Sequence, residues 1–84
     1  MNEIAAALLK MSDDALEPSM KAIIREWSDP PKSIEILEVL DKCIFSSLCT
    51  DFVIHALQIV YDQALLAEGK THLDNEPLAT WRNI

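Results

Sequence analysis

The sequence predicts an all-α protein, on three observations. Only one glycine occurs in 84 residues, so the chain has little material for hairpin turns. Apolar residues recur at spacings of three and four, which is the period of an amphipathic helix. The four prolines, at positions 18, 30, 31 and 77, fall between or at the start of these periodic segments. We therefore expect a small helical bundle of three longer helices and a short N-terminal helix.

The first two helices are expected in the N-terminal third of the chain. Asn2 can cap a short helix whose apolar face runs from Ile4 to Met11. Pro18 suits the first turn of the second helix, because its missing N–H is not needed there. This helix should continue to Trp27. The prolines at 30 and 31 then force a stop, because the residue before a proline is pushed out of the helical region.

The third helix is expected from about Pro31 or Ser33 to Leu48, and the fourth from Asp51 to Glu68. Thr50 is a suitable N-cap for the fourth helix, and Gly69 is a suitable C-terminal stop. The connection between the two helices is short, so we expect them to form an antiparallel hairpin. Residues 1–76 then form a single domain.

The fourth helix is apolar on nearly every side. Its consistently polar strip consists of His55, Gln58 and Asp62. A helix of this kind is normally buried on several sides, so we expect it to be the central helix. The third helix is apolar over most of its circumference, and Asp41 interrupts that apolar arc. Asp41 is expected to extend its carboxylate to solvent or to pair, for example with Lys10, Lys21 or Arg25; the less favoured alternative is a buried acid with a raised pKa.

Residues 77–84 form a C-terminal tail. Pro77 can open a single helical turn there, with Leu78, Trp81 and Ile84 at a spacing of three. Such a turn can dock on the chain's own core or on a partner.

Charge and hydropathy exclude several classes of function. The formal net charge is −7, from 14 acidic and 7 basic residues spread along the whole chain. This field opposes binding to nucleic acid and to anionic membranes. No apolar run approaches the roughly 18 residues that are needed to cross a bilayer. The N-terminus, Met-Asn-Glu-Ile, does not have the pattern of a signal peptide, so we expect a cytoplasmic protein with Cys43 and Cys49 as reduced thiols.

The sequence predicts no metal, cofactor or catalytic site. Cys43, Cys49 and His55 recur at intervals of six, whereas zinc sites use tighter pairs on one turn or knuckle. A cysteine nucleophile needs a histidine held by a third polar group, and no such arrangement is evident. Ser47-Leu48 before a helix resembles the attachment site of acyl carrier proteins, but the aspartate that precedes the serine in that family is Ser46 here. Carrier function is therefore ranked last.

Surplus apolar surface makes protein binding the leading functional hypothesis. A chain of this length buries only about 60 to 65% of the surface that its unfolded form exposes. We expect self-association through the third and fourth helices, with a symmetric homodimer as the default. The alternative is an acidic inhibitor, immunity-type or nucleic-acid-mimic protein that blocks a basic target. The residues expected to contact a protein partner are Ile34, Asp41, Phe45, Ile59, Leu66, Leu78 and Trp81.

Overall fold

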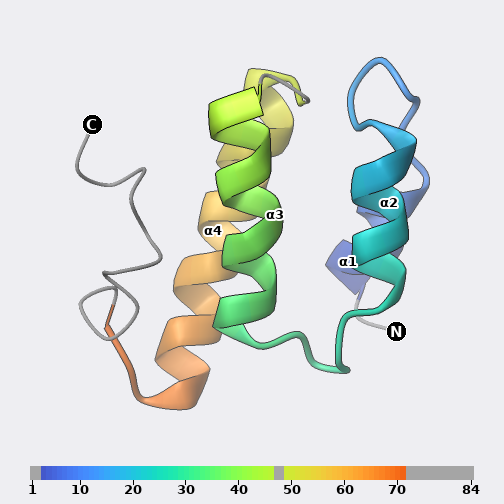
Figure 1. Ribbon diagram of the computed structural model, residues 1–84. Coiled ribbons are helices and arrows are strands. Elements are labelled where there is room, and N and C mark those ends of the chain that lie inside the picture. Colours follow the sequence, from blue (N-terminus) through green and yellow to red (C-terminus); the bar gives the residue numbers. More distant parts are fainter. Residues whose placement is uncertain (1–2, 47–48, 72–84) are drawn as a thin grey trace.

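The computed structural model describes residues 3–46 and 49–71, and it confirms the all-α class. Within these residues the chain forms four helices and no strand (Figure 1). Their bounds are α1 Glu3–Leu9, α2 Pro18–Arg25, α3 Ser33–Ser46 and α4 Asp51–Glu68. The tail from residue 77 onward, and the turn expected in it, lie outside the described residues.

The second helix is shorter than expected. It has eight residues, close to the seven of α1, whereas α3 has 14 and α4 has 18. Beyond Arg25, the N–H groups of Glu26 and Trp27 bond to carbonyls only three residues back, which tightens the last turn and ends the helix. The described residues thus form two short and two long helices, where three longer helices and one short one were expected.

The long helices and the short helices occupy different halves of the molecule. α3 and α4 lie side by side and share the most extensive helix contact, while α1 and α2 pack together on the other side (Figure 1). The loop between α1 and α2 reaches the start of α4. There, Leu16 forms an isolated antiparallel bridge with Cys49, and the Thr50 N–H donates to the Ala15 carbonyl at 3.2 Å.

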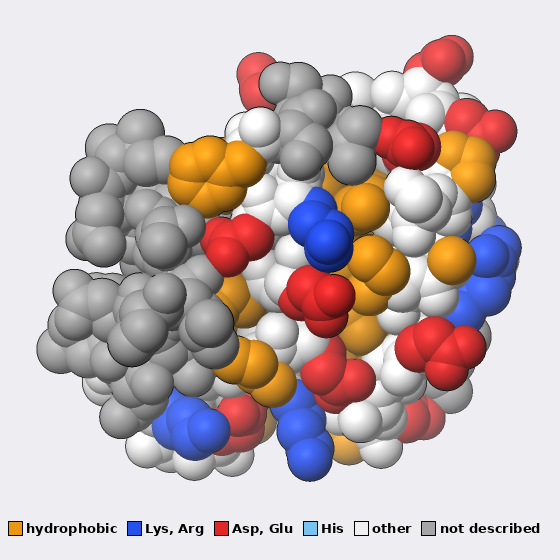
Figure 2. Space-filling model, in the orientation of Figure 1, with side chains coloured by type: hydrophobic (Ala, Val, Ile, Leu, Met, Phe, Trp, Pro, Cys, Tyr) orange, Lys and Arg blue, Asp and Glu red, His pale blue; other side chains and the backbone are white. Residues whose placement is uncertain are grey.

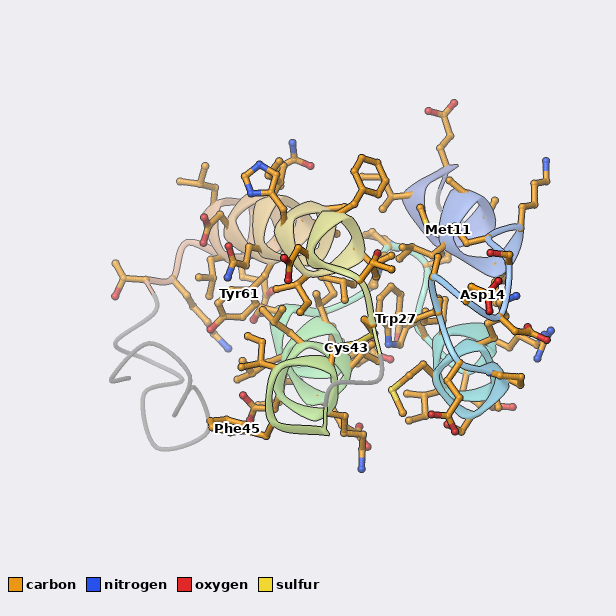
Figure 3. The ribbon with its side chains drawn as sticks, turned by 90° about the horizontal axis from the view of Figure 1, so that it is seen from above. Met11, Asp14, Trp27, Cys43, Phe45 and Tyr61 are labelled. Atoms are coloured by element: carbon orange, nitrogen blue, oxygen red, sulfur yellow. A yellow bond between two sulfur atoms is a disulfide. The ribbon has the colours of Figure 1, made fainter. Side chains whose placement is uncertain are left out.

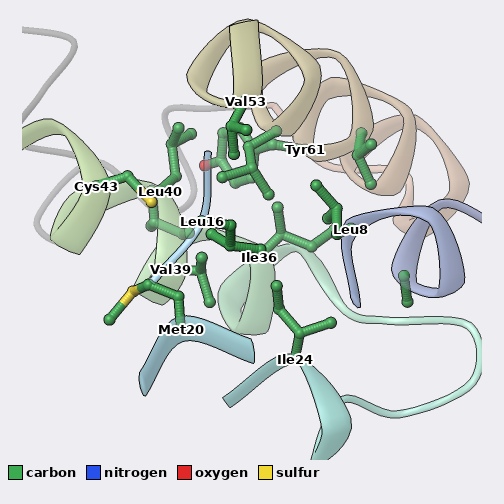
Figure 4. Packing of buried hydrophobic residues seen from close by; sticks show 14 of the residues in the cluster. Leu8, Leu16, Met20, Ile24, Ile36, Val39, Leu40, Cys43, Val53 and Tyr61 are labelled. Atoms are coloured by element: carbon green, nitrogen blue, oxygen red, sulfur yellow. The ribbon is translucent and has the colours of Figure 1, made fainter. Parts of the chain in front are cut away.

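The core is continuous across both halves. Tyr61 of α4, Leu8 of α1 and Leu16 of the first loop are completely or almost completely buried (Figure 4). Trp27, which lies just beyond α2, is partly buried against this cluster. The other buried apolar members are Ala5, Met20, Ile24, Ile36, Leu37, Val39, Leu40, Cys43, Val53, Leu57, Val60 and Leu65.

Two glutamates hold the N-terminus of α3. Lys32, the residue before the helix, has no side-chain acceptor for the free N–H groups of the first turn. Glu35 accepts from the backbone N–H of Lys32 at 3.0 Å and from that of Ser28 at 2.9 Å, which is half of a capping box. Partial burial acts to raise the pKa of Glu35, but these hydrogen bonds outweigh it and the pKa lies below its usual value.

The second glutamate comes from the far end of α4. The Glu68 carboxylate accepts from the Ser33 backbone N–H at 2.8 Å and from the Ser33 hydroxyl at 3.0 Å. Ser33 is fully buried, so both of its donors depend on partners inside the protein. The first residue of α3 and the last residue of α4 are thereby joined.

Both ends of α4 follow the sequence prediction. The Thr50 hydroxyl accepts from the Val53 N–H at 3.4 Å and caps the first turn. Gly69 adopts φ 67°, a left-handed conformation that glycine tolerates readily, and it ends the helix.

The expectation of two reduced thiols is wrong for this structure. Cys43 and Cys49 form a disulfide that joins the end of α3 to the segment before α4. The reduced state was inferred only from the expected compartment. The interval of six was interpreted as if both residues lay on one helix, whereas α3 ends at Ser46, before Cys49.

We expect Glu68→Ala to lower the free energy of unfolding by roughly 1 to 2 kcal/mol. The substitution leaves the two buried donors of Ser33 without their charged acceptor. Urea denaturation followed by circular dichroism measures the change. Glu38→Ala, at an exposed acid of α3, is the matched control and should cost much less. Equal losses for the two variants would contradict the role of Glu68.

Replacing both cysteines with alanine should lower the free energy of unfolding by roughly 2 kcal/mol, the size expected for a disulfide that closes a short loop. Melting both proteins with and without reductant provides the control. Reductant should lower the melting temperature of the original chain and leave that of the double variant unchanged. Two titratable free thiols in the purified, non-reduced protein would show that the disulfide does not form.

Candidate protein-binding surfaces

Three large apolar side chains form an exposed line along α4, which we call the α4 stripe: Phe52, Ile59 and Leu66. Their side chains are 71%, 47% and 80% exposed, respectively. They are seven residues apart, which is close to two helical turns, so they lie almost directly above one another. The stripe extends over nearly the whole helix.

The α4 stripe lies opposite the buried face of its helix. The buried residues of α4 are centred about 160° around the helix from the stripe, at 100° per residue. Tyr61, on that buried face, lies between α4 and α3 in Figure 3. Within the described residues, α3 packs extensively against the inner side of α4 and the outer side is open, so the expectation that α4 is enclosed on several sides is not met there.

The residues beside the α4 stripe carry little charge. Ala56 and Gln63 lie along one edge of the stripe, and His55 and Asp62 lie along the other. His55, Asp62 and Gln63 are exposed, and Ala56 is half-buried. Two members of the polar strip that the sequence indicated, His55 and Asp62, are thus exposed as expected, and the third, Gln58, is half-buried.

A second apolar region, the α3 surface, comprises Ile34, Asp41 and Phe45. The side chains of Ile34 and Phe45 are 41% and 55% exposed. These three positions fall within about 40° of one another around α3. Phe45 projects from α3 on the side away from α4 (Figure 3). The α3 surface and the α4 stripe are therefore separate faces of the molecule.

Ile34 and Asp41 also border a concavity of about 330 Å³. In the described part of the chain, its wall comes from α3 alone and is completed by Leu37, Glu38 and Lys42. Over α3, Figure 2 shows apolar, acidic and basic side chains interspersed rather than one continuous apolar patch.

Among the described residues, no cation forms an ion pair with Asp41. Its Oδ1 atom is buried and has no hydrogen-bond partner within the described residues. Burial raises the pKa of its carboxyl group above the usual value. Lys21, one of the expected partners, instead donates to the Met11 carbonyl and, at 3.2 Å, to Asp13. The raised pKa is thus confirmed, and pairing with Lys21 is wrong.

The structure divides the predicted contact residues between two faces. Ile34, Asp41 and Phe45 lie on α3, whereas Ile59 and Leu66 lie on α4. Leu78 and Trp81 lie outside the described residues, as does Ser47, the serine of the carrier hypothesis. The sequence analysis missed Phe52, although its seven-residue spacing from Ile59 and Leu66 could have identified it.

Other parts of the described chain offer no clear chemical centre. No group of three or more His, Cys, Asp or Glu side chains there could hold a metal ion. A cleft of about 470 Å³ lies where Ile4 of α1, the prolines at 30 and 31, and Ala64 of α4 meet. Its lining also includes the polar residues Ser28, Asp29, Lys32, Gln63 and Glu68, and the Glu68 carboxylate is already engaged by Ser33.

Comparison of the chain with protein-family models, with characterised proteins and with solved structures finds no match. No helix between residues 3 and 71, apart from the two residues left undescribed, is long and apolar enough to cross a membrane.

Asp41→Asn should stabilise the protein at neutral pH by about 1 kcal/mol, the lower end of the cost of an unsatisfied buried polar group. The folded-state pKa of Asp41 is raised, so ionisation costs stability once the pH exceeds the unfolded-state value. The gain should therefore be largest above the folded-state pKa and vanish below the unfolded-state pKa. Denaturation at neutral and at acidic pH measures it. Asp14→Asn, at an exposed acid, is the control. A gain that does not change with pH would contradict this origin.

Proposed function

We propose that this protein is a protein-interaction module that associates with a second copy of itself and has no catalytic activity of its own. The α4 stripe is the main support for this proposal. Single exposed apolar residues are common on monomers, but here three large ones form one line along an 18-residue helix. Covering such a line with protein removes apolar surface from water, which is the main favourable term in most association reactions.

The proposal places this interface on an antiparallel hairpin of α3 and α4 within a small helical bundle. The contact between Ser33 and Glu68 supports the hairpin, since it joins the beginning of one helix to the end of the other. A homodimer is the simplest assembly, because twofold symmetry is the commonest arrangement of identical chains. The α3 surface is a second candidate interface, and its exposed Phe45 is suited to anchor a partner.

Location in the cytoplasm remains a prediction. The disulfide between Cys43 and Cys49 removes one argument for it, because disulfides persist mainly in oxidising compartments.

Leu66→Glu should weaken self-association by at least about 100-fold, because a symmetric interface loses this side chain twice. Sedimentation equilibrium at tens of micromolar measures the change. Ala22→Glu adds the same charge at an exposed position of α2 and should leave the association unchanged.

Phe45→Glu tests the α3 surface in the same experiment. If this variant dissociates while Leu66→Glu does not, the interface lies on α3. A folded, monomeric original chain at these concentrations would overturn the proposal of self-association. Binding to a basic protein that weakens steeply with salt would instead favour the inhibitor alternative.

A further inference from the structure

We infer that α4 pairs with α4 of a second copy in an antiparallel register centred on Ile59. The inference rests on the proposed self-association and adds to it the surface, the direction of the two helices and the residues that meet.

The outer face of α4 has the spacing of a helix-packing seam. Phe52, Ala56, Ile59, Gln63 and Leu66 follow one another at intervals of four, three, four and three. This alternation places side chains along the line of contact between two helices. The large residues Phe52, Ile59 and Leu66 alternate with the small Ala56 and the flexible Gln63. The large side chains of one helix can therefore pack beside the smaller ones of the other. The helix is about 27 Å long, and the seam occupies most of it.

Ile59 lies midway between the other two members of the stripe. An antiparallel pair centred on it places Phe52 level with the partner's Leu66, and Ile59 level with the partner's Ile59. All three large side chains then face another large apolar side chain.

Charge favours this direction over the parallel one. His55 and Asp62 lie on the same edge of the seam. In an antiparallel symmetric pair, each edge meets the same edge of the other helix. His55 is then level with the partner's Gln63, one residue along the axis from the partner's Asp62. An imidazole N–H can donate to that carboxylate, and symmetry makes the contact twice.

A parallel pair does not bring these two groups together. In that arrangement each edge meets the opposite edge of the partner helix, where Val53 and Val60 are buried in the protein's own core and Ala67 is exposed. His55 and Asp62 would then meet no charged side chain on that edge.

The direction of the helix dipoles supports the same arrangement, because antiparallel pairing sets the dipoles of the two α4 helices in opposite directions. The chain carries −7, so two copies repel one another on most approaches. Between Phe52 and Ala67, Asp62 is the only acidic residue of α4, which makes this side a favourable one for approach.

Cysteine cross-linking tests the direction of the helices. We expect a mixture of Phe52→Cys and Leu66→Cys chains to form a covalent mixed dimer under mild oxidation, identified by intact mass. Each variant alone should form little covalent dimer. In the antiparallel pair, the added cysteine of one chain lies about 21 Å along the helix axis from the same cysteine of the other chain. The chain without an added cysteine is the control for exchange with the native disulfide. Efficient cross-linking of each single variant with itself would overturn the antiparallel register.

Charge reversal provides a second test that leaves the α4 stripe intact. His55→Asp should weaken dimerisation about fivefold or more, because it places two acids at each of two contacts. Adding Asp62→Lys to the same chain should restore the affinity. If the double variant is no tighter than His55→Asp alone, the two positions do not meet across the interface.

The two proposals fail in different ways. A monomeric original chain overturns both of them. A dimer that Leu66→Glu dissociates, but that gives no mixed cross-link and no charge rescue, overturns the antiparallel register and leaves self-association standing.

Discussion

The architecture depends on a mismatch in length between the two halves of the protein. At 1.5 Å per residue, α1 and α2 are each only about 10 to 12 Å long, whereas α4 extends about 27 Å. The short pair can cover one side of the long pair, and it does so with a continuous core that includes Leu8, Leu16 and Ile24. Within the described chain, the outer side of α4 is left open. The exposed apolar stripe is therefore a consequence of how helical residues are distributed along the chain, and it does not result from loose packing inside.

Apolar surface is not the only feature that distinguishes the open side of α4. Elsewhere acidic side chains are frequent, and they give the molecule a field that repels a copy of itself. Along the middle of α4 acidic side chains are few, so this repulsion is weaker there. A histidine and an aspartate lie on one edge of the stripe. Apolar contact would supply affinity there, while the charged edge would select the direction in which two helices meet. The α3 surface has a different character, because its two exposed apolar residues flank an acid whose burial is unfavourable at neutral pH.

The sequence predicted the features that depend on local chemistry. Thr50 and Gly69 set the bounds of α4, and Pro18 set the start of α2, because caps and prolines act within a few residues. It did not predict the joining of Ser33 to Glu68 or of Cys43 to Cys49, which depend on how segments meet in space. The exposure of Leu66 was indicated, but the open face as a whole was not. The same apolar pattern suits a helix buried all round and a helix with one open face, and only the arrangement of the other helices distinguishes the two.

The bridge between Leu16 and Cys49 bears on the order in which the chain assembles. Contacts between the end of α3 and the start of α4 join segments that are close in sequence, so they lose little entropy on closure and are expected to form early. The bridge joins residues 33 positions apart, at the point where the disulfide and the cap of α4 also lie. The loop between α1 and α2 thus has a well-defined docking point only after the segment before α4 has formed. We therefore expect the N-terminal third to be the last part to join, and to be the first to detach in partial unfolding.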